Sequence, residues 1–267
     1  MKKLTVLIPT YNRLTPLGML LTSLSFQRDA DFDIIIADQS EDERIFYDTS
    51  LRTIIRLLKI KNHEIRMLRN MPVLGMAQQR QFLLEQSQTR YSLFIDDDLI
   101  LEPYVIRNLC RTIENEQCGF VGNAVIGLSY LADIRPHQQH IEFWETEIKP
   151  EIINPGQDKW ERHKLHNAAN VYHVQQQRKV STDSPIKYKV AWVGGCVLYD
   201  TEKLKDTGGF LFWKDLPKNH CGEDVLAQLR VMKKYGGCGI LPSGVYHQEL
   251  PTSVPDRRIN APEYLPI

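Results

Sequence analysis

The chain has 267 residues, 42% of them hydrophobic and 25% charged, a composition typical of a globular protein with one large domain or two small ones. Its 33 Lys and Arg residues balance its 33 Asp and Glu residues, which argues against a nucleic-acid partner held by bulk charge. The five cysteines are scattered and form no C-x-x-C pair, so we expect reduced thiols rather than disulfides or zinc.

The chain begins Met1-Lys2-Lys3-Leu4 and enters a strand-like run of about five apolar residues at once. That run is too short for a signal peptide or a membrane span, and no later window offers a spanning segment. We therefore expect a cytoplasmic protein, with a peripheral contact at the inner face of a membrane left open.

The first hundred residues alternate between strand-like and helix-like patterns. The patterns predict strands at 4–8, 32–37, 64–68 and 91–95, with helices at 14–27, 44–58 and 74–86. Pro9 is expected to stop the first strand. This alternation is typical of an α/β fold with a parallel sheet and right-handed crossovers. The polar loops at Thr10, Asp38 and Asp96 each follow a strand, so they should gather at one sheet edge and form one nucleotide pocket.

Three consecutive carboxylates, Asp96, Asp97 and Asp98, follow the strand predicted at 91–95. Adjacent acids share a buried site only if a positive charge neutralises them, and oxygen ligands suit Mg²⁺ or Mn²⁺. The sequence therefore indicates a divalent-metal site. The alternative is a solvated acidic turn before a helix that Pro103 begins.

The second half of the chain is less regular. A helix is expected at 103–116 and a strand at 119–125, and then the periodicity weakens. We divide one domain, 1–267, into a nucleotide-binding half (1–125), an insert (126–189), an acceptor and catalytic half (190–249) and a tail (250–267). The insert is read as helix and loop over the ligand edge. In it, His163 and His166 are spaced i, i+3, which favours a structural helix face over a metal site.

The acceptor half carries three further patterns. A strand is expected at 190–199 with a Gly-Gly break, then a helix that begins near Thr201 and ends at Gly208-Gly209. The pair Glu223-Asp224 opens a helix that runs to about Lys234, and short strands are expected at 239–241 and 245–247.

Five segments in this order resemble the family-2 glycosyltransferases of the GT-A fold, a Rossmann-like, mostly parallel sheet flanked by helices. They are VLIPTYNR at 6–13, IADQS at 36–40, FIDDD at 94–98, VGGC at 193–196, and CGED at 221–224 leading to VYH at 245–247. The sequence departs from the family at Ala37, where a second acid is usual, and at Gln81, where Asn is frequent. The Q-x-x-R-W motif of processive synthases is absent, which favours addition of one sugar per encounter.

The resemblance implies an inverting, metal-dependent transfer of a hexosyl or N-acetylhexosaminyl group in polysaccharide biosynthesis. The donor would be a nucleoside-diphosphate sugar, by analogy a UDP-sugar, and the acceptor a saccharide or glycoconjugate hydroxyl. The D-x-D motif and a histidine would hold Mn²⁺ or Mg²⁺ through Asp98 and His247. Nucleotide contacts are assigned to Pro9, Thr10, Tyr11, Arg13, Asp38, Arg80, Asp96 and Asp97. Asp224 is the candidate general base and Glu223 its neighbour that orients it or binds the acceptor. Sugar contacts are assigned to Gly194, Gly195, Trp192 and Trp213.

Each assignment has a structural alternative. His247 can be an ordinary half-buried histidine, and Thr10 and Tyr11 can be simple turn residues after Pro9. Arg80 can lie on a solvated helix face. Two acids at a helix start can serve the helix dipole alone, and each tryptophan can be core.

Two other functions compete with sugar transfer. A nucleotidyltransferase of similar fold is expected to carry a glycine-rich, basic loop after the first strand, where this chain has Pro9-Thr10-Tyr11-Asn12. A non-catalytic nucleotide- or sugar-binding module is expected to lose the acids, yet Asp96, Asp98, Glu223 and Asp224 are all present.

Overall fold

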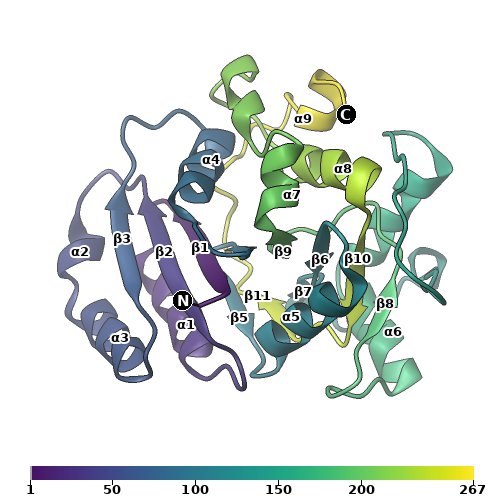
Figure 1. Ribbon diagram of the computed structural model, residues 1–267, viewed down its shortest axis with the longest axis horizontal. Coiled ribbons are helices and arrows are strands. Elements are labelled where there is room, and N and C mark those ends of the chain that lie inside the picture. Colours follow the sequence, from purple (N-terminus) through teal and green to yellow (C-terminus); the bar gives the residue numbers. More distant parts are fainter. Residues whose placement is uncertain (1) are drawn as a thin grey trace.

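The computed structural model describes residues 2–267, so Met1, where the predicted nucleotide-binding half starts, lies outside the described residues. A central eight-stranded sheet has the order β3-β2-β1-β4-β9-β6-β10-β8, and β5, β11 and β7 form a smaller three-stranded sheet (Figure 1). In the large sheet, β9 and β8 run against the other strands, so the sheet is mostly parallel as the sequence predicts. The strands are β1 (Leu4–Thr10), β2 (Phe32–Asp38), β3 (Ile65–Arg69), β4 (Tyr91–Ile95), β5 (Leu99–Leu101), β6 (Phe120–Gly122), β7 (Ile126–Gly127), β8 (Ile186–Tyr188), β9 (Cys196–Asp200), β10 (Gly237–Leu241) and β11 (Val245–His247).

Helices cover both faces of the large sheet. The α-helices are α1 (Leu14–Ser25), α2 (Arg44–Tyr47), α3 (Thr49–Ile60), α4 (Met76–Gln86), α5 (Val105–Glu116), α6 (Asn170–Arg178), α7 (Thr201–Asp206), α8 (Glu223–Tyr235) and α9 (Ala261–Tyr264). Four 3₁₀ helices, counted over residues 2–267, are η1 (Leu128–Tyr130), η2 (Pro136–Gln138), η3 (Asp158–His166) and η4 (Leu211–Asp215). Within the described residues, no helix combines the length and the apolar character needed to cross a bilayer.

Alternation along the strands divides the interior into two cores. Val6 and Ile8 of β1 pack with α1, α3 and α5 on one face, whereas Leu7 packs with α4, α7 and α8 on the other. The same split separates Leu93 from Phe94 in β4. Successive side chains of a strand point to opposite faces, so strands covered on both faces are apolar at nearly every position.

Several boundaries differ from those expected; the strand expected at 119–125, for example, is Phe120–Gly122. Two of the differences have a clear local reason. Strand β1 continues through Pro9 to Thr10, because its pairing with β4 ends at Leu7 and a proline beyond that point interrupts no ladder on that side. The helix predicted at 44–58 is two helices, because Asp48 is extended and caps α3 by accepting a hydrogen bond from the Leu51 amide.

The expected strand at 190–199 is shorter than predicted. Only Cys196–Asp200 pairs as β9, and the preceding residues through Gly195 are irregular. Gly195 has a φ of +78°, and a Cβ there would lie 2.7 Å from the side chain of Val125. The Gly-Gly break therefore precedes the strand, which begins at Cys196, instead of interrupting it.

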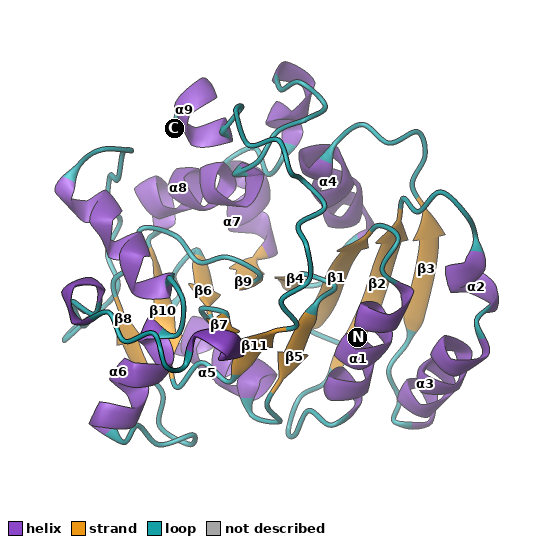
Figure 2. Ribbon diagram, turned by 180° about the vertical axis from the view of Figure 1, so that it is seen from behind, coloured by secondary structure: helices purple, strands orange, loops and turns teal. Residues whose placement is uncertain are grey.

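The carboxyl ends of β1, β2 and β4 meet at one edge, as the loop pattern predicts. Thr10 pairs in register with Asp38, and the amide of Asp96 donates to the carbonyl of Gly195 at 2.9 Å. The chain after β11 crosses this edge and returns to α8, where α9 packs (Figure 2). This C-terminal segment, residues 250–267, therefore lies over the edge where the polar loops gather.

Candidate active site

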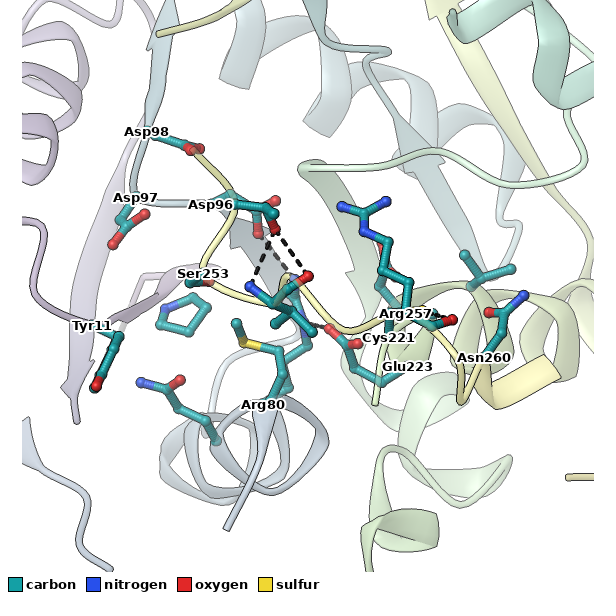
Figure 3. Close-up of a pocket in the computed structure, with 18 of the residues that line it drawn as sticks. Tyr11, Arg80, Asp96, Asp97, Asp98, Cys221, Glu223, Ser253, Arg257 and Asn260 are labelled. Atoms are coloured by element: carbon teal, nitrogen blue, oxygen red, sulfur yellow. Dashed lines mark hydrogen bonds and ion pairs between the residues drawn. The ribbon is translucent and has the colours of Figure 1, made fainter. Parts of the chain in front are cut away.

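A cavity of about 730 Å³ opens at this edge of the sheet. Its lining comes mainly from five parts of the chain: the end of β1 with its loop, the loop after β4, the start of α4, the start of α8, and the C-terminal segment. Trp160, Trp192 and His247 complete it. Figure 3 shows the acidic side chains after β4 on one side of it and those of the α8 region on the other. The arrangement brings residues more than two hundred positions apart into one site.

The acidic corner after β4 is neutralised in part by Arg13. Its guanidinium lies 3.0 Å from Asp97 and 2.5 Å from Asp98, and the Thr10 hydroxyl donates to Asp97 at 2.6 Å. Burial raises the pKa of Asp97 to about 6, because Thr10 and Arg13 only partly offset the loss of water. Burial, together with the charge of Asp96, also raises the pKa of Asp98. The corner is thus short of positive charge, and a bound cation would stabilise it.

Arg80 of α4 joins the two acidic groups of the cavity. Its Nη2 lies 2.9 Å from Asp96, and its Nε lies 2.9 Å from Glu223, 143 positions later. The side chain is 7% exposed, so the alternative of a solvated helix face is wrong. Burial acts to lower the pKa of Arg80, but the neighbouring carboxylates outweigh it and raise that pKa. The buried guanidinium of Arg80 therefore bridges the loop after β4 and the first turn of α8.

Asp224 lies beside Glu223 in the first turn of α8, which follows Gly222 at a φ of +73°. The carboxyl group is packed among protein atoms, although the residue keeps some surface facing the cavity. Burial and the nearby charge of Glu223 raise the pKa of Asp224 to about 7, against the attraction of Arg80. A carboxylate with a pKa near neutrality is suited to accept and release a proton.

The two predicted metal ligands, Asp98 and His247, lie side by side in the cavity. The imidazole Nε2 of His247 lies 3.4 Å from a carboxylate oxygen of Asp98, and its Nδ1 accepts from the Glu249 amide at 2.7 Å. Among residues 2–267, no group of three or more His, Cys, Asp or Glu side chains converges on one point as a preformed metal cage. A carboxylate oxygen and an imidazole nitrogen suit Mn²⁺, with its remaining positions left to oxygens of a ligand and water. Nε2 could bind the metal only with the ring proton on Nδ1, which would end the hydrogen bond from the Glu249 amide.

The cavity collects most of the residues that the sequence singles out. The lining includes Pro9, Thr10, Tyr11, Arg13, Arg80, Asp96, Asp97, Asp98, Trp192, Glu223, Asp224 and His247. Four others lie outside the lining: Asp38, Gly194, Gly195 and Trp213. Asp38 is buried behind the lining, where it accepts hydrogen bonds from Ser40 and pairs with Arg69. Trp213 packs against the core formed with α8.

Two parts of the lining have no counterpart among the predicted site residues. The insert contributes Trp160 from η3, and the C-terminal segment contributes Arg257 and Asn260, among others. Arg257 has no carboxylate partner among the described residues, unlike Arg13 and Arg80. The sequence predicts that the insert as a whole lies over the ligand edge, but both segments lack hydrophobic periodicity, so no sequence signal singles out Trp160, Arg257 or Asn260.

The profile of the family described as "Glycosyl transferase family 2" matches residues 5–182. An uncharacterized glycosyltransferase from Haemophilus influenzae is 28% identical to this chain over 119 residues, which cover 44% of this chain and 37% of that protein. The family match therefore includes the acidic residues after β4 and ends before those at the start of α8. The relative is matched over about a third of its own length.

Two solved structures share the fold at low sequence identity. Residues 1–349 of S. aureus TarS in complex with UDP-GlcNAc are 16% identical, with a TM-score of 0.56, covering 94% of this chain and 60% of that one. The mannosyltransferase PcManGT from Pyrobaculum calidifontis in complex with GDP-Man and Mn²⁺ is 15% identical, with a TM-score of 0.54, covering 89% and 56%. The chain thus spans less than two thirds of either structure.

Proposed function

Because this chain belongs to glycosyl transferase family 2, we propose that it transfers one sugar from a nucleoside-diphosphate sugar to an acceptor hydroxyl, with inversion at the anomeric carbon. The observation that carries the proposal is the single cavity with two acidic groups, one after β4 and one at the start of α8. Arg80 lies between the two groups and forms an ion pair with one carboxylate of each. One group serves the leaving diphosphate and the other the attacking hydroxyl.

The leaving-group side is the corner formed by Asp98, His247 and Arg13. A divalent cation bound there would act as a Lewis acid on the diphosphate, whose negative charge grows as the sugar leaves. Asp98 and His247 would hold that cation. Arg13 is paired with Asp97 and Asp98, and its guanidinium N–H groups would donate to the phosphate oxygens. Asp96 would hold the ribose, and Pro9, Thr10 and Tyr11 would contact the base.

The acceptor side is served by Asp224. Once deprotonated, its carboxylate takes the proton of the acceptor hydroxyl as that oxygen attacks from the face opposite the diphosphate. Its raised pKa, about 7, gives it the proton affinity that this step needs. Glu223 stays paired with Arg80 and orients the first turn of α8. The backbone at Gly194 and Gly195, beside Asp96, would leave room for the donor sugar.

The finer specificity is also part of the proposal. We propose a UDP-sugar carrying a hexose or an N-acetylhexosamine, in which the N3–H of uracil would reach Asp38 only if its carboxylate turned away from Ser40 and Arg69. That carboxylate lies behind the lining, so a comparison of UDP with GDP decides this point. The proposal also includes a saccharide or glycoconjugate acceptor, non-processive transfer and a cytoplasmic site. Of these, the cytoplasmic site agrees with the five free cysteines among the described residues.

Binding of UDP with and without Mn²⁺, followed by a donor screen, tests the proposal. We expect the melting temperature to rise with UDP plus Mn²⁺ more than with either alone, and one sugar nucleotide to release its nucleoside diphosphate. No shift with UDP and none with GDP, each with Mn²⁺, would contradict the assignment of this cavity to a donor nucleotide.

A further inference from the structure

Three aromatic rings stand together at the α8 side of the cavity. His163 and Trp192 are stacked with ring centroids 6.0 Å apart and planes 10° apart, and Trp160 lies 5.7 Å from His163 at 51°. The His163 ring also holds the chain at Trp160, since its Nδ1 lies 2.7 Å from the carbonyl of that residue. Trp160 and Trp192 line the cavity, so the three rings form one half-buried aromatic wall.

Hydrogen bonds and ion pairs fix this wall relative to the candidate base. The amide of Val193, next to Trp192, donates to the Gln228 side chain at 2.8 Å, and Gln228 in turn donates to the carbonyl of Asp224 at 3.2 Å. On the insert side, Arg162 anchors η3 through ion pairs of 2.8 Å with Glu142 and with Glu151. The wall therefore cannot shift far from the first turn of α8.

One polar atom in the wall is unpartnered. The indole Nε1 of Trp192 is buried and has no hydrogen-bond acceptor among the described residues. A buried N–H without a partner is costly, and buried indoles usually find one. Because this atom has almost no accessible surface, a ligand hydroxyl oxygen would supply the acceptor once the indole turns toward the cavity.

We propose that the aromatic wall binds the pyranose ring of a saccharide acceptor, with Trp160 packing on the ring face and Trp192 donating a hydrogen bond to a ring hydroxyl. This inference rests on the proposed function and names its acceptor class. A pyranose has an apolar C–H face and a rim of hydroxyls, which match an indole surface beside an indole N–H. Since the wall is fixed to α8, a hydroxyl of the bound ring would lie at Asp224, and the insert would select the acceptor.

The test uses the full chain with the donor found in the screen and Mn²⁺. Release of nucleoside diphosphate is measured without acceptor, with a panel of methyl pyranosides, and with sorbitol as an open-chain polyol. The variants are Trp160→Ala, Trp160→Phe, which keeps an aromatic face, and Trp144→Phe as a matched control outside the cavity. Thermal melting shows that each variant is folded.

We expect a methyl pyranoside, and not sorbitol, to stimulate release by wild-type protein. Trp160→Ala should raise the KM for that pyranoside about 10-fold, the size of a lost aromatic contact. Trp160→Phe should remain within about threefold, and Trp144→Phe should match wild type. Stimulation by sorbitol alone, an unchanged acceptor KM in Trp160→Ala, or a rise confined to the donor KM would overturn the inference. Absence of any release from any donor would instead overturn the proposed function.

Discussion

Replacing Asp224 by Asn should abolish transfer and, as pH rises, stabilise the fold relative to wild type. The pKa of this carboxyl is raised from 3.8 to about 7, chiefly by burial. A group whose pKa is raised in the folded state adds stability below its unfolded pKa and loses that stability as pH rises through the folded pKa. Asn resembles the protonated acid and does not titrate, so the variant lacks this loss.

The size of the effect follows from the shift. About three pH units at 1.36 kcal/mol each give about 4 kcal/mol in total. About a third of this is already lost at pH 5, since the carboxyl is ionised in the unfolded chain there, which leaves about 2–3 kcal/mol between pH 5 and pH 8. Urea unfolding of wild type and Asp224→Asn at both pH values measures the difference directly.

The same carboxyl sets the expected pH dependence of activity. Wild-type transfer should rise with pH through about 7, because the base acts only when deprotonated. Glu145→Gln, which alters an exposed carboxylate without an ion pair among the described residues, is the control and should follow wild type in both assays. If wild type and Asp224→Asn differ by the same free energy at pH 5 and pH 8, the buried carboxyl does not titrate as argued. Retention of more than about a tenth of the wild-type rate by Asp224→Asn would rule it out as the base, since that loss is typically 10²–10⁴-fold.

Three further substitutions test the rest of the cavity. Asp98→Asn should remove the Mn²⁺-dependent part of UDP binding, and an unchanged thermal shift with UDP plus Mn²⁺ would count against Asp98 as a metal ligand. Arg80→Met should lower the free energy of unfolding by about 3 kcal/mol, because it leaves the buried carboxylate of Glu223 without its partner; urea unfolding measures this, and a loss under about 1 kcal/mol would refute the bridging role. Arg257→Gln should raise the donor KM about threefold to tenfold if this cation meets the diphosphate, whereas Arg258→Gln, exposed and paired outside the lining, should not; equal effects of the two would contradict a specific contact.

The sheet and the acidic groups could be predicted because both leave local signals. Strand β4 is a short apolar run that ends in carboxylates, and its predicted bounds match those observed. The alternation of strands and helices placed Thr10 and Asp97 at one edge, where their side chains form a hydrogen bond. Periodicity and the order of motifs are properties of the linear sequence, so both can be recognised without a structure.

The pairings within the site could not be predicted. Arg80 joins Glu223 across 143 positions, and nothing near either residue indicates that one guanidinium serves both acidic groups. Trp160 and Arg257 lie in segments without periodicity, and their place at the cavity depends on distant anchors such as the ion pairs of Arg162. Asp38 lies at the end of its strand as expected, yet its carboxylate accepts from Ser40 and pairs with Arg69. A buried carboxylate needs such partners, and these two lie nearby.

The crossing of the cavity by the C-terminal segment has a practical consequence. Arg13 donates to the carbonyl of Pro251 at 2.7 Å, and Cys221 exchanges backbone hydrogen bonds with Ile259 and Ala261 at 2.9 and 2.8 Å. A shortened protein that stops after Glu249 would keep every strand of the large sheet and still lose one wall of its binding site. Ligand screening therefore belongs with proteins that keep residues 250–267.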